Sequence, residues 1–90
     1  MKSVPLSRLP LGVSARIESI VENPVFGKLD RMVGRRLADL GFSDGMPVTV
    51  IALGPFGKGP YAVRLGNLSQ FSLRNAEADK IICCFEEGGV

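Results

Sequence analysis

The sequence predicts a mainly β fold, in which a small barrel of about five short strands carries one inserted α-helix. One observation is a single amphipathic helical segment that ends at a glycine. Another is a series of short apolar segments of alternating polarity, separated by Gly- and Pro-rich turns. The third is the length of 90 residues, 46% of them hydrophobic, which suits a single domain over residues 1–90 with one modest core.

The opening residues 4–12 are expected to be extended, because Pro and Gly in this segment exclude a helix. Two apolar residues within it, Leu6 and Leu9, should dock on the barrel. Residues 13–21 form the first predicted strand, whose inward side chains are Ala15, Ile17 and Ile20. The spacing of these side chains changes from two to three, which predicts a β-bulge near Glu18 and Ser19.

The helical segment is predicted from Lys28 to Leu40. Its apolar residues recur at spacings that gather them on one stripe, which should face the core: Leu29, Met32, Val33, Leu37 and Leu40. Charged residues occupy the other side: Lys28, Asp30, Arg31, Arg35 and Asp39. Gly41 follows, at a position where a left-handed backbone favours a residue without a Cβ atom.

The second half of the sequence predicts four more short strands. They cover residues 46–53, residues 61–65, a segment around Phe71 and Leu73, and residues 80–85, with a single helical turn at 74–79 before the last. Such short strands make too small a sheet for an open sandwich. Closure into a barrel would bury their apolar faces and remove exposed edges. An SH3-like barrel with the helix between its first two strands is therefore expected.

The segment from Arg36 to Val50 resembles the core of the FeoA family, the small cytoplasmic components of bacterial ferrous iron transport. It reads Arg-Leu-Ala-Asp-Leu-Gly-Phe-Ser-Asp-Gly-Met-Pro-Val-Thr-Val, with the family's Leu-Gly pair, a second Gly and then a strand. The resemblance continues along nearly the whole chain, at Leu6, Leu9, Gly12, Ala15, Ile17, Pro55, Gly57, Pro60, Ser72, Leu73, Arg74, Ala78 and Ile81.

The resemblance implies an SH3-like barrel that assists or regulates FeoB, the membrane transporter with a cytosolic GTP-binding domain. The same domain type is similar to the C-terminal module of metal-dependent repressors related to the diphtheria toxin repressor. A metal-sensing regulatory module is therefore the alternative. No helix-turn-helix precedes the barrel, which favours a stand-alone transport accessory. A cytoplasmic location without direct membrane insertion is expected, because no export signal or spanning segment is visible.

Catalysis is not expected from this composition. The sequence contains no His, which removes the commonest general base and the usual partner of a Ser or Cys nucleophile. The Gly-rich stretch at residues 54–59 lacks the residue order of a P-loop. The sequence therefore predicts no enzyme and no catalytic residue.

A metal site is not expected either, because Fe²⁺ prefers imidazole and carboxylate ligands and this chain has no imidazole. The acid pairs Glu77 with Asp79 and Glu86 with Glu87 are more simply explained as solvated side chains. Adjacent Cys83 and Cys84 should point to opposite faces of a strand, one packed inside and one half exposed. We expect no cofactor, with a bound transition metal ion as the weaker alternative and iron as the cargo of the transport system.

Protein recognition is the remaining function. A net charge of +2 without clustered aromatic residues does not favour nucleic acid. Arg31 and Arg35 on the helix would suit an acidic partner. Phe56 in the Gly/Pro loop is either an exposed contact or a cover for one end of the barrel. The predicted partner-binding residues are Arg31, Arg35, Phe56 and Lys58, and the predicted partner is FeoB or a second copy of the chain.

Overall fold

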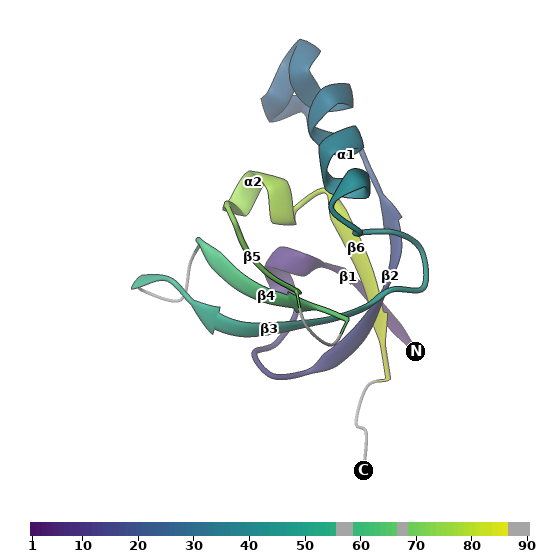
Figure 1. Cartoon of the computed structure of the whole chain (residues 1–90), viewed down its shortest axis with the longest axis vertical. Helices are drawn as coiled ribbons and strands as arrows, with labels where there is room; N and C mark the ends of the chain where they lie inside the picture. Colours follow the sequence, from purple (N-terminus) through teal and green to yellow (C-terminus); the bar gives the residue numbers. More distant parts are fainter. Residues whose placement is uncertain (56–58, 67–68, 87–90) are drawn as a thin grey trace.

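The computed structural model describes residues 1–55, 59–66 and 69–86 (Figure 1). Over these residues all the strands belong to one antiparallel sheet with the order β1-β6-β2-β3-β4-β5. In chain order the elements are β1 (Lys2–Pro5), the 3₁₀ turn η1 (Leu6–Arg8), β2 (Ser14–Ile20), the 3₁₀ segment η2 (Pro24–Leu29), α1 (Asp30–Asp39), β3 (Pro47–Leu53), β4 (Tyr61–Leu65), β5 (Ser69–Leu73), α2 (Asn75–Ala78) and β6 (Ile81–Phe85). The mainly β prediction is confirmed.

The sequence missed strand β1. Lys2 pairs with Phe85 and Pro5 with Ile82, so β1 exists because the far end of the chain supplies its partner β6. A four-residue segment with a proline shows no local pattern that could predict this pairing. The sheet therefore contains one strand more than the expected five within the described residues.

The predicted bulge in β2 is confirmed. The register of β2 against β6 changes between Ile17 and Ser19. On the other side of the strand, the backbone N–H of Ile17 donates to the carbonyl of Met46 at 2.9 Å. Ala15 and Ile17 are buried as predicted, and Ile20 packs half-buried against the core.

The core fills the concave side of the sheet. Leu6 and Leu9 are both buried there, as expected from the opening segment. Phe42, at 0% exposure, places its ring centre 5.5 Å from that of Phe71 with the planes tilted by 57°, a favourable aromatic geometry. Cys83 is buried while Cys84 is half-buried, which also agrees with the sequence prediction.

The two end strands of the sheet, β1 and β5, are not paired with each other among the described residues. A side-chain contact joins the elements that follow them. The Ser7 hydroxyl in η1 donates a hydrogen bond to the Asp79 carboxylate at the end of α2. The expected removal of edges is therefore incomplete, and this polar contact connects the two sides of the open seam.

Helix α1 and segment η2 project from one end of the barrel, away from the end where the first residues lie (Figure 1). None of the helices in the described ranges is long and apolar enough to cross a membrane.

Candidate interaction surface

The first residue of α1 is held by a buried cation. The Lys80 ammonium, whose residue is 1% exposed, forms an ion pair with Oδ1 of Asp30. The same oxygen accepts the backbone N–H of Asn23 at 2.8 Å, and the ammonium lies 5.8 Å from the centre of the Phe26 ring. This ion pair joins the start of the projecting helix to the residue before β6. No pattern in the sequence indicates this ion pair, because Lys80 is expected there only as the start of a strand.

The electrostatics of this anchor favour the ionised carboxylate. The hydrogen bond from Lys80, together with the one from the Asn23 N–H, lowers the pKa of Asp30 below its ordinary value. The carboxylate therefore stays charged at neutral pH and compensates the buried ammonium, which would otherwise be costly.

The face of α1 that packs against the barrel consists of few residues. Gly34 lies so near the sheet that an added Cβ atom would sit 3.7 Å from side-chain carbons of both Ile20 and Lys80. Leu37 is the fully buried residue of this helix, and Val33 packs partly buried against the core. Gly41 ends the helix with φ at 110°, a conformation in which a side chain would be strained, as the sequence predicted.

The rest of the predicted apolar stripe is not core. Met32 is 67% exposed, Leu29 is 58% exposed, and Leu40 is also exposed. The prediction that the whole stripe faces the core is therefore wrong. The physical reason is that the sheet covers only the middle of the stripe, where Val33 and Leu37 meet the core, and leaves the residues nearer the two ends of α1 in solvent. Val25 of η2 is 73% exposed, and we call Val25, Leu29 and Met32 the apolar tip.

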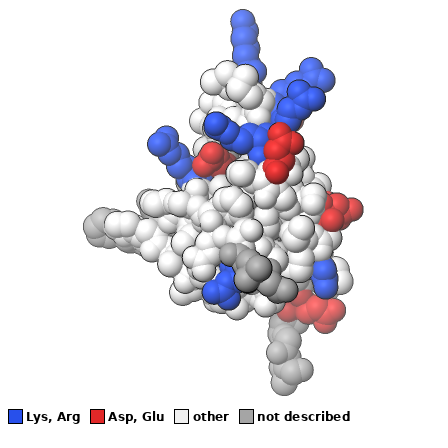
Figure 2. Space-filling model, in the orientation of Figure 1, with Lys and Arg blue, Asp and Glu red and all other residues white. Residues whose placement is uncertain are grey.

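Cations surround the apolar tip, and we call Lys28, Arg31, Arg35 and Arg36 the basic rim. All four are exposed, and none of them forms an ion pair within the described parts of the chain. Figure 2 shows Lys and Arg side chains gathered over the α1 end of the molecule. The predicted contact residues Arg31 and Arg35 thus lie on one surface. Phe56 and Lys58, predicted to act with them, fall outside the described residues.

A groove of about 710 Å³ adjoins the basic rim. One wall consists of Phe26 and Arg36, from η2 and α1, and the other includes Ser72, Arg74 and Glu77, from β5 and α2. Arg36 belongs to both the rim and the groove, so the two features form one continuous surface. This groove could not be predicted from the sequence, because its walls come from residues far apart along the chain.

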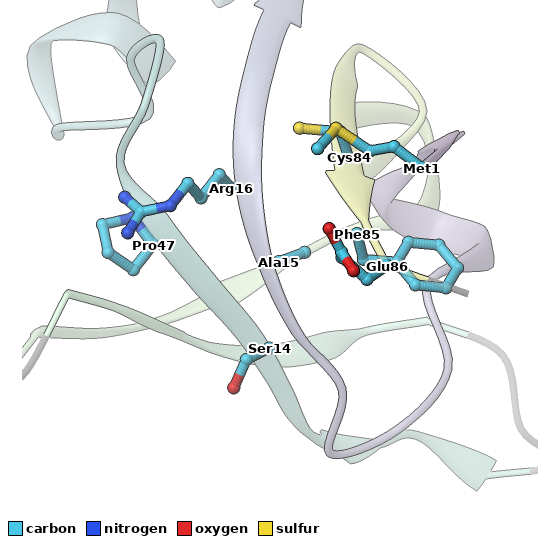
Figure 3. A pocket seen from close by; sticks show the side chains of 8 residues that line it. All are labelled: Met1, Ser14, Ala15, Arg16, Pro47, Cys84, Phe85 and Glu86. Carbon is cyan, nitrogen blue, oxygen red and sulfur yellow. The ribbon is translucent and has the colours of Figure 1, made fainter. Parts of the chain in front are cut away.

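A second hollow, of about 320 Å³, lies where β2, the start of β3 and the end of β6 meet (Figure 3). Its lining includes Met1, Arg16, Cys84 and Glu86. The guanidinium of Arg16 donates a hydrogen bond to the carbonyl of Gly45 at 2.9 Å. Behind this hollow, burial raises the pKa of the Cys83 thiol to about 12, with smaller contributions from Cys84 and Glu18. Cys83 is therefore a protonated, weakly nucleophilic thiol at neutral pH.

The acids considered as metal ligands make local structural contacts. A carboxylate oxygen of Glu77 accepts the backbone N–H of Arg74 at 2.9 Å, and Asp79 accepts hydrogen bonds from Ser7 and Asn75. Within residues 1–55, 59–66 and 69–86, no three side chains among His, Cys, Asp and Glu lie together in a group that could hold a metal ion. Glu87 is outside those ranges, and the expectation of no resident metal stays a prediction.

Comparison with protein families gives a match to the FeoA domain over residues 4–83, which is most of the chain. The chain belongs to the FeoA domain family. This assignment confirms the resemblance seen in the sequence. The FeoA family is an accessory domain family and not a known class of enzymes. A search of curated proteins gave no match.

Solved structures agree with the FeoA assignment. FeoA from Stenotrophomonas maltophilia, an SH3 domain protein crystallised with zinc, is 36% identical, and the match covers 93% of this chain and 91% of that one with a TM-score of 0.74. FeoA protein from Chlorobium tepidum is 30% identical over 96% of this chain and 76% of that chain, with a TM-score of 0.71. The SH3-like fold is thus confirmed, and family and fold support a role related to ferrous iron transport.

The FeoA barrel is also similar to part of a larger regulator. A manganese-dependent transcriptional repressor matches with a TM-score of 0.69 at 20% identity, over 89% of this chain and 40% of the repressor chain. At that identity the likeness concerns the fold alone.

Proposed function

We propose that this chain is an accessory protein of bacterial ferrous iron transport, which acts by binding the cytosolic part of the FeoB transporter. The observation that carries the proposal is the FeoA match over residues 4–83, which covers the helix and all of the barrel except the outer ends of β1 and β6. The barrel offers a partner an exposed helix with several cations that form no ion pair among the described residues, and such a surface suits recognition of an acidic protein.

The residues proposed for this contact are those predicted from the sequence. Arg31 and Arg35 are exposed on α1, where their guanidinium groups can form bidentate hydrogen bonds with carboxylates of a partner. Phe56 and Lys58, which follow β3 in the sequence, are proposed as a second contact region.

The same chemistry supports a protein that is not an enzyme and has no resident cofactor. The chain contains no His, and the burial of Cys83 keeps its thiol protonated. Glu77 and Asp79 are engaged in contacts around α2. In this proposal iron is the cargo of the transporter, and the accessory protein acts in the cytoplasm by contact alone.

The test is a titration of the purified chain against the purified cytosolic part of FeoB, by biolayer interferometry, with and without guanine nucleotides. We expect saturable binding in at least one nucleotide state. A chain carrying both Arg35→Glu and Phe56→Ala should bind more weakly, whereas Arg64→Glu, which changes an exposed cation on β4, should leave binding unchanged. Absence of binding in every nucleotide state would contradict the proposal.

A second titration separates this proposal from a metal-sensing function. Fe²⁺ is added to the purified chain under reducing, oxygen-free conditions and followed by calorimetry. Weak or undetectable heat is expected. Tight, stoichiometric binding would instead favour a metal-sensing module like those of the repressors with the same fold.

A further inference from the structure

The side chains of the apolar tip are mostly exposed and are not packed in the core of the barrel. Leu29 and Met32 are neighbours on the helix surface because they are three residues apart, and Val25 belongs to the segment η2 that contacts α1. All three side chains are more than half exposed. A cluster of large apolar side chains at the end of a projecting element costs hydration free energy without adding to the core. Clusters of this kind mark places where another molecule binds.

The charges around the tip indicate the chemistry of the bound molecule. The four cations of the basic rim lie within nine successive residues, and Arg31 and Arg35 are one helical turn apart, where like charges repel. None of them is neutralised by a carboxylate in the described chain. A second copy bound through the same surface would bring the two rims face to face. A partner with carboxylates opposite the rim is therefore favoured over a second copy.

The shape beside the tip distinguishes a protein from a membrane. An anionic bilayer could also accept an apolar tip with a basic rim, but a bilayer presents a broad, nearly flat surface. Here the groove lined by Phe26, Arg36 and Arg74 shares Arg36 with the rim, so the surface beside the tip is hollowed and not flat. A folded protein can fill such a groove with its own side chains while it receives the tip.

We infer that the apolar tip and the basic rim together form the docking element of this chain for a protein partner that offers an apolar depression ringed by carboxylates. The tip would enter the depression in the manner of a helix bound in a groove, and Arg36 and Arg74 would hold an acidic segment beside it. The ion pair between Asp30 and Lys80 fixes the start of α1, so little conformational freedom is lost on binding.

This inference rests on the proposed function, because FeoB is the protein on which we expect the apolar depression to lie. The experiment compares two matched pairs of variants in the titration against the cytosolic part of FeoB. Leu29→Ser with Met32→Ser removes the tip, and Leu11→Ser with Leu53→Ser removes two other exposed leucines from outside it. Arg31→Glu with Arg35→Glu reverses the rim, and Arg8→Glu with Arg64→Glu reverses two exposed cations elsewhere.

We expect each tip or rim double variant to raise Kd by about tenfold or more. The tip variant loses two apolar side chains that would be buried in the complex, and the rim variant loses two ion pairs with the partner. The control pairs should change Kd by less than about threefold. The rim pair should also flatten the dependence of Kd on salt. Thermal unfolding of every variant should match the wild-type chain within a few degrees, because all the changed residues are exposed.

The outcomes separate the two hypotheses. If the wild-type chain binds FeoB and the tip and rim double variants bind it as tightly as the wild-type chain does, the docking element is refuted and the proposed function stands. If the wild-type chain does not bind at all, both fail. Sedimentation with vesicles of phosphatidylglycerol and phosphatidylcholine that depends on the tip would assign it to lipid, and tip-dependent dimerisation in analytical ultracentrifugation would assign it to a second copy. Either result overturns the inference.

Discussion

The barrel and helix α1 differ in what their apolar side chains do. In β4, Tyr61, Val63 and Leu65 are all buried against the rest of the curled sheet. In α1, Leu37 is buried, but Met32 and its neighbour Leu29 face solvent. Stability of this domain therefore resides in the barrel, which holds one face of the helix and leaves the opposite, exposed face available for recognition. The contrast can be tested by changing one region at a time.

The largest difference is expected from truncating one apolar side chain in each region. Phe42→Ala removes a fully buried ring that packs against Phe71, and should lower the free energy of unfolding by about 3–5 kcal/mol. Met32→Ala removes a mostly exposed side chain and should change it by less than about 0.5 kcal/mol. Urea unfolding followed by circular dichroism measures both. A comparable loss in the two variants would show that the tip is part of the core.

The next largest effect is expected at the first residue of α1. Asp30→Asn keeps the shape of the side chain but leaves the buried Lys80 ammonium without a counter-charge, so the Tm should fall by on the order of 10 °C. Adding Lys80→Met should restore most of the loss, because an apolar side chain of similar size needs no counter-charge. Differential scanning calorimetry measures the three proteins. A double variant no more stable than Asp30→Asn would contradict this account of the anchor.

The anchor also predicts the direction of acid sensitivity. The pKa of Asp30 is lowered from an ordinary value of 3.8 in the folded chain. Its stabilisation is therefore present above that value and is lost as the pH falls below it. The Asp30→Asn chain should lack this part of the acid dependence.

A smaller effect concerns the barrel at alkaline pH. The pKa of Cys83 is about 12 in the folded chain, against an ordinary value of 9.0. The protonated Cys83 thiol therefore contributes to the free energy of unfolding. This contribution is fully present below pH 9.0 and is lost as the pH rises toward 12, with a loss on the order of 1 kcal/mol by pH 10. Urea unfolding between pH 8 and pH 10.5 should show a steeper decline for the wild-type chain than for Cys83→Val. Cys84→Ser should keep most of the wild-type slope, because burial is the largest cause of the raised pKa of Cys83. Equal declines with pH in the wild-type chain and both variants would refute the raised pKa of Cys83 as the cause.

The smallest effect should be an increase in the free energy of unfolding from a substitution at the inner face of α1. Gly34→Ala places a methyl group at ordinary contact distance from Ile20 and Lys80, and alanine favours the helix, so unfolding should cost about 0.5–1 kcal/mol more. Gly41→Ala is the matched control at the end of the helix. Its φ of 110° and a contact of 3.0 Å to Leu65 should make that variant less stable. Chemical denaturation measures both, and a loss at Gly34 would contradict the prediction.

Most of the barrel could be predicted because its signals are local. The alternation of Tyr61, Val63 and Leu65, the change of spacing after Ile17, and the glycine at position 41 each depend on a few neighbouring residues. Strand β1 could not be predicted in this way, because it forms only by pairing with residues at the other end of the chain.

The helix was predicted in position but not in burial. Periodicity identifies which side of a helix is apolar, and it carries no information about whether another element faces that side. For the same reason the sequence could not show that Lys80 is buried or that Arg36 and Arg74 border one groove, since both depend on tertiary placement. The contact roles of Arg31, Arg35, Phe56 and Lys58 stay predictions.

The pairing of Lys2 with Phe85 brings the first and last strands together at the end of the molecule opposite α1 (Figure 1). A tag, dye or fused protein attached before Lys2 or after Phe85 would therefore leave from the side remote from the helix. On a sensor chip, a molecule tethered through either end would hold its helix outward into the flowing solution.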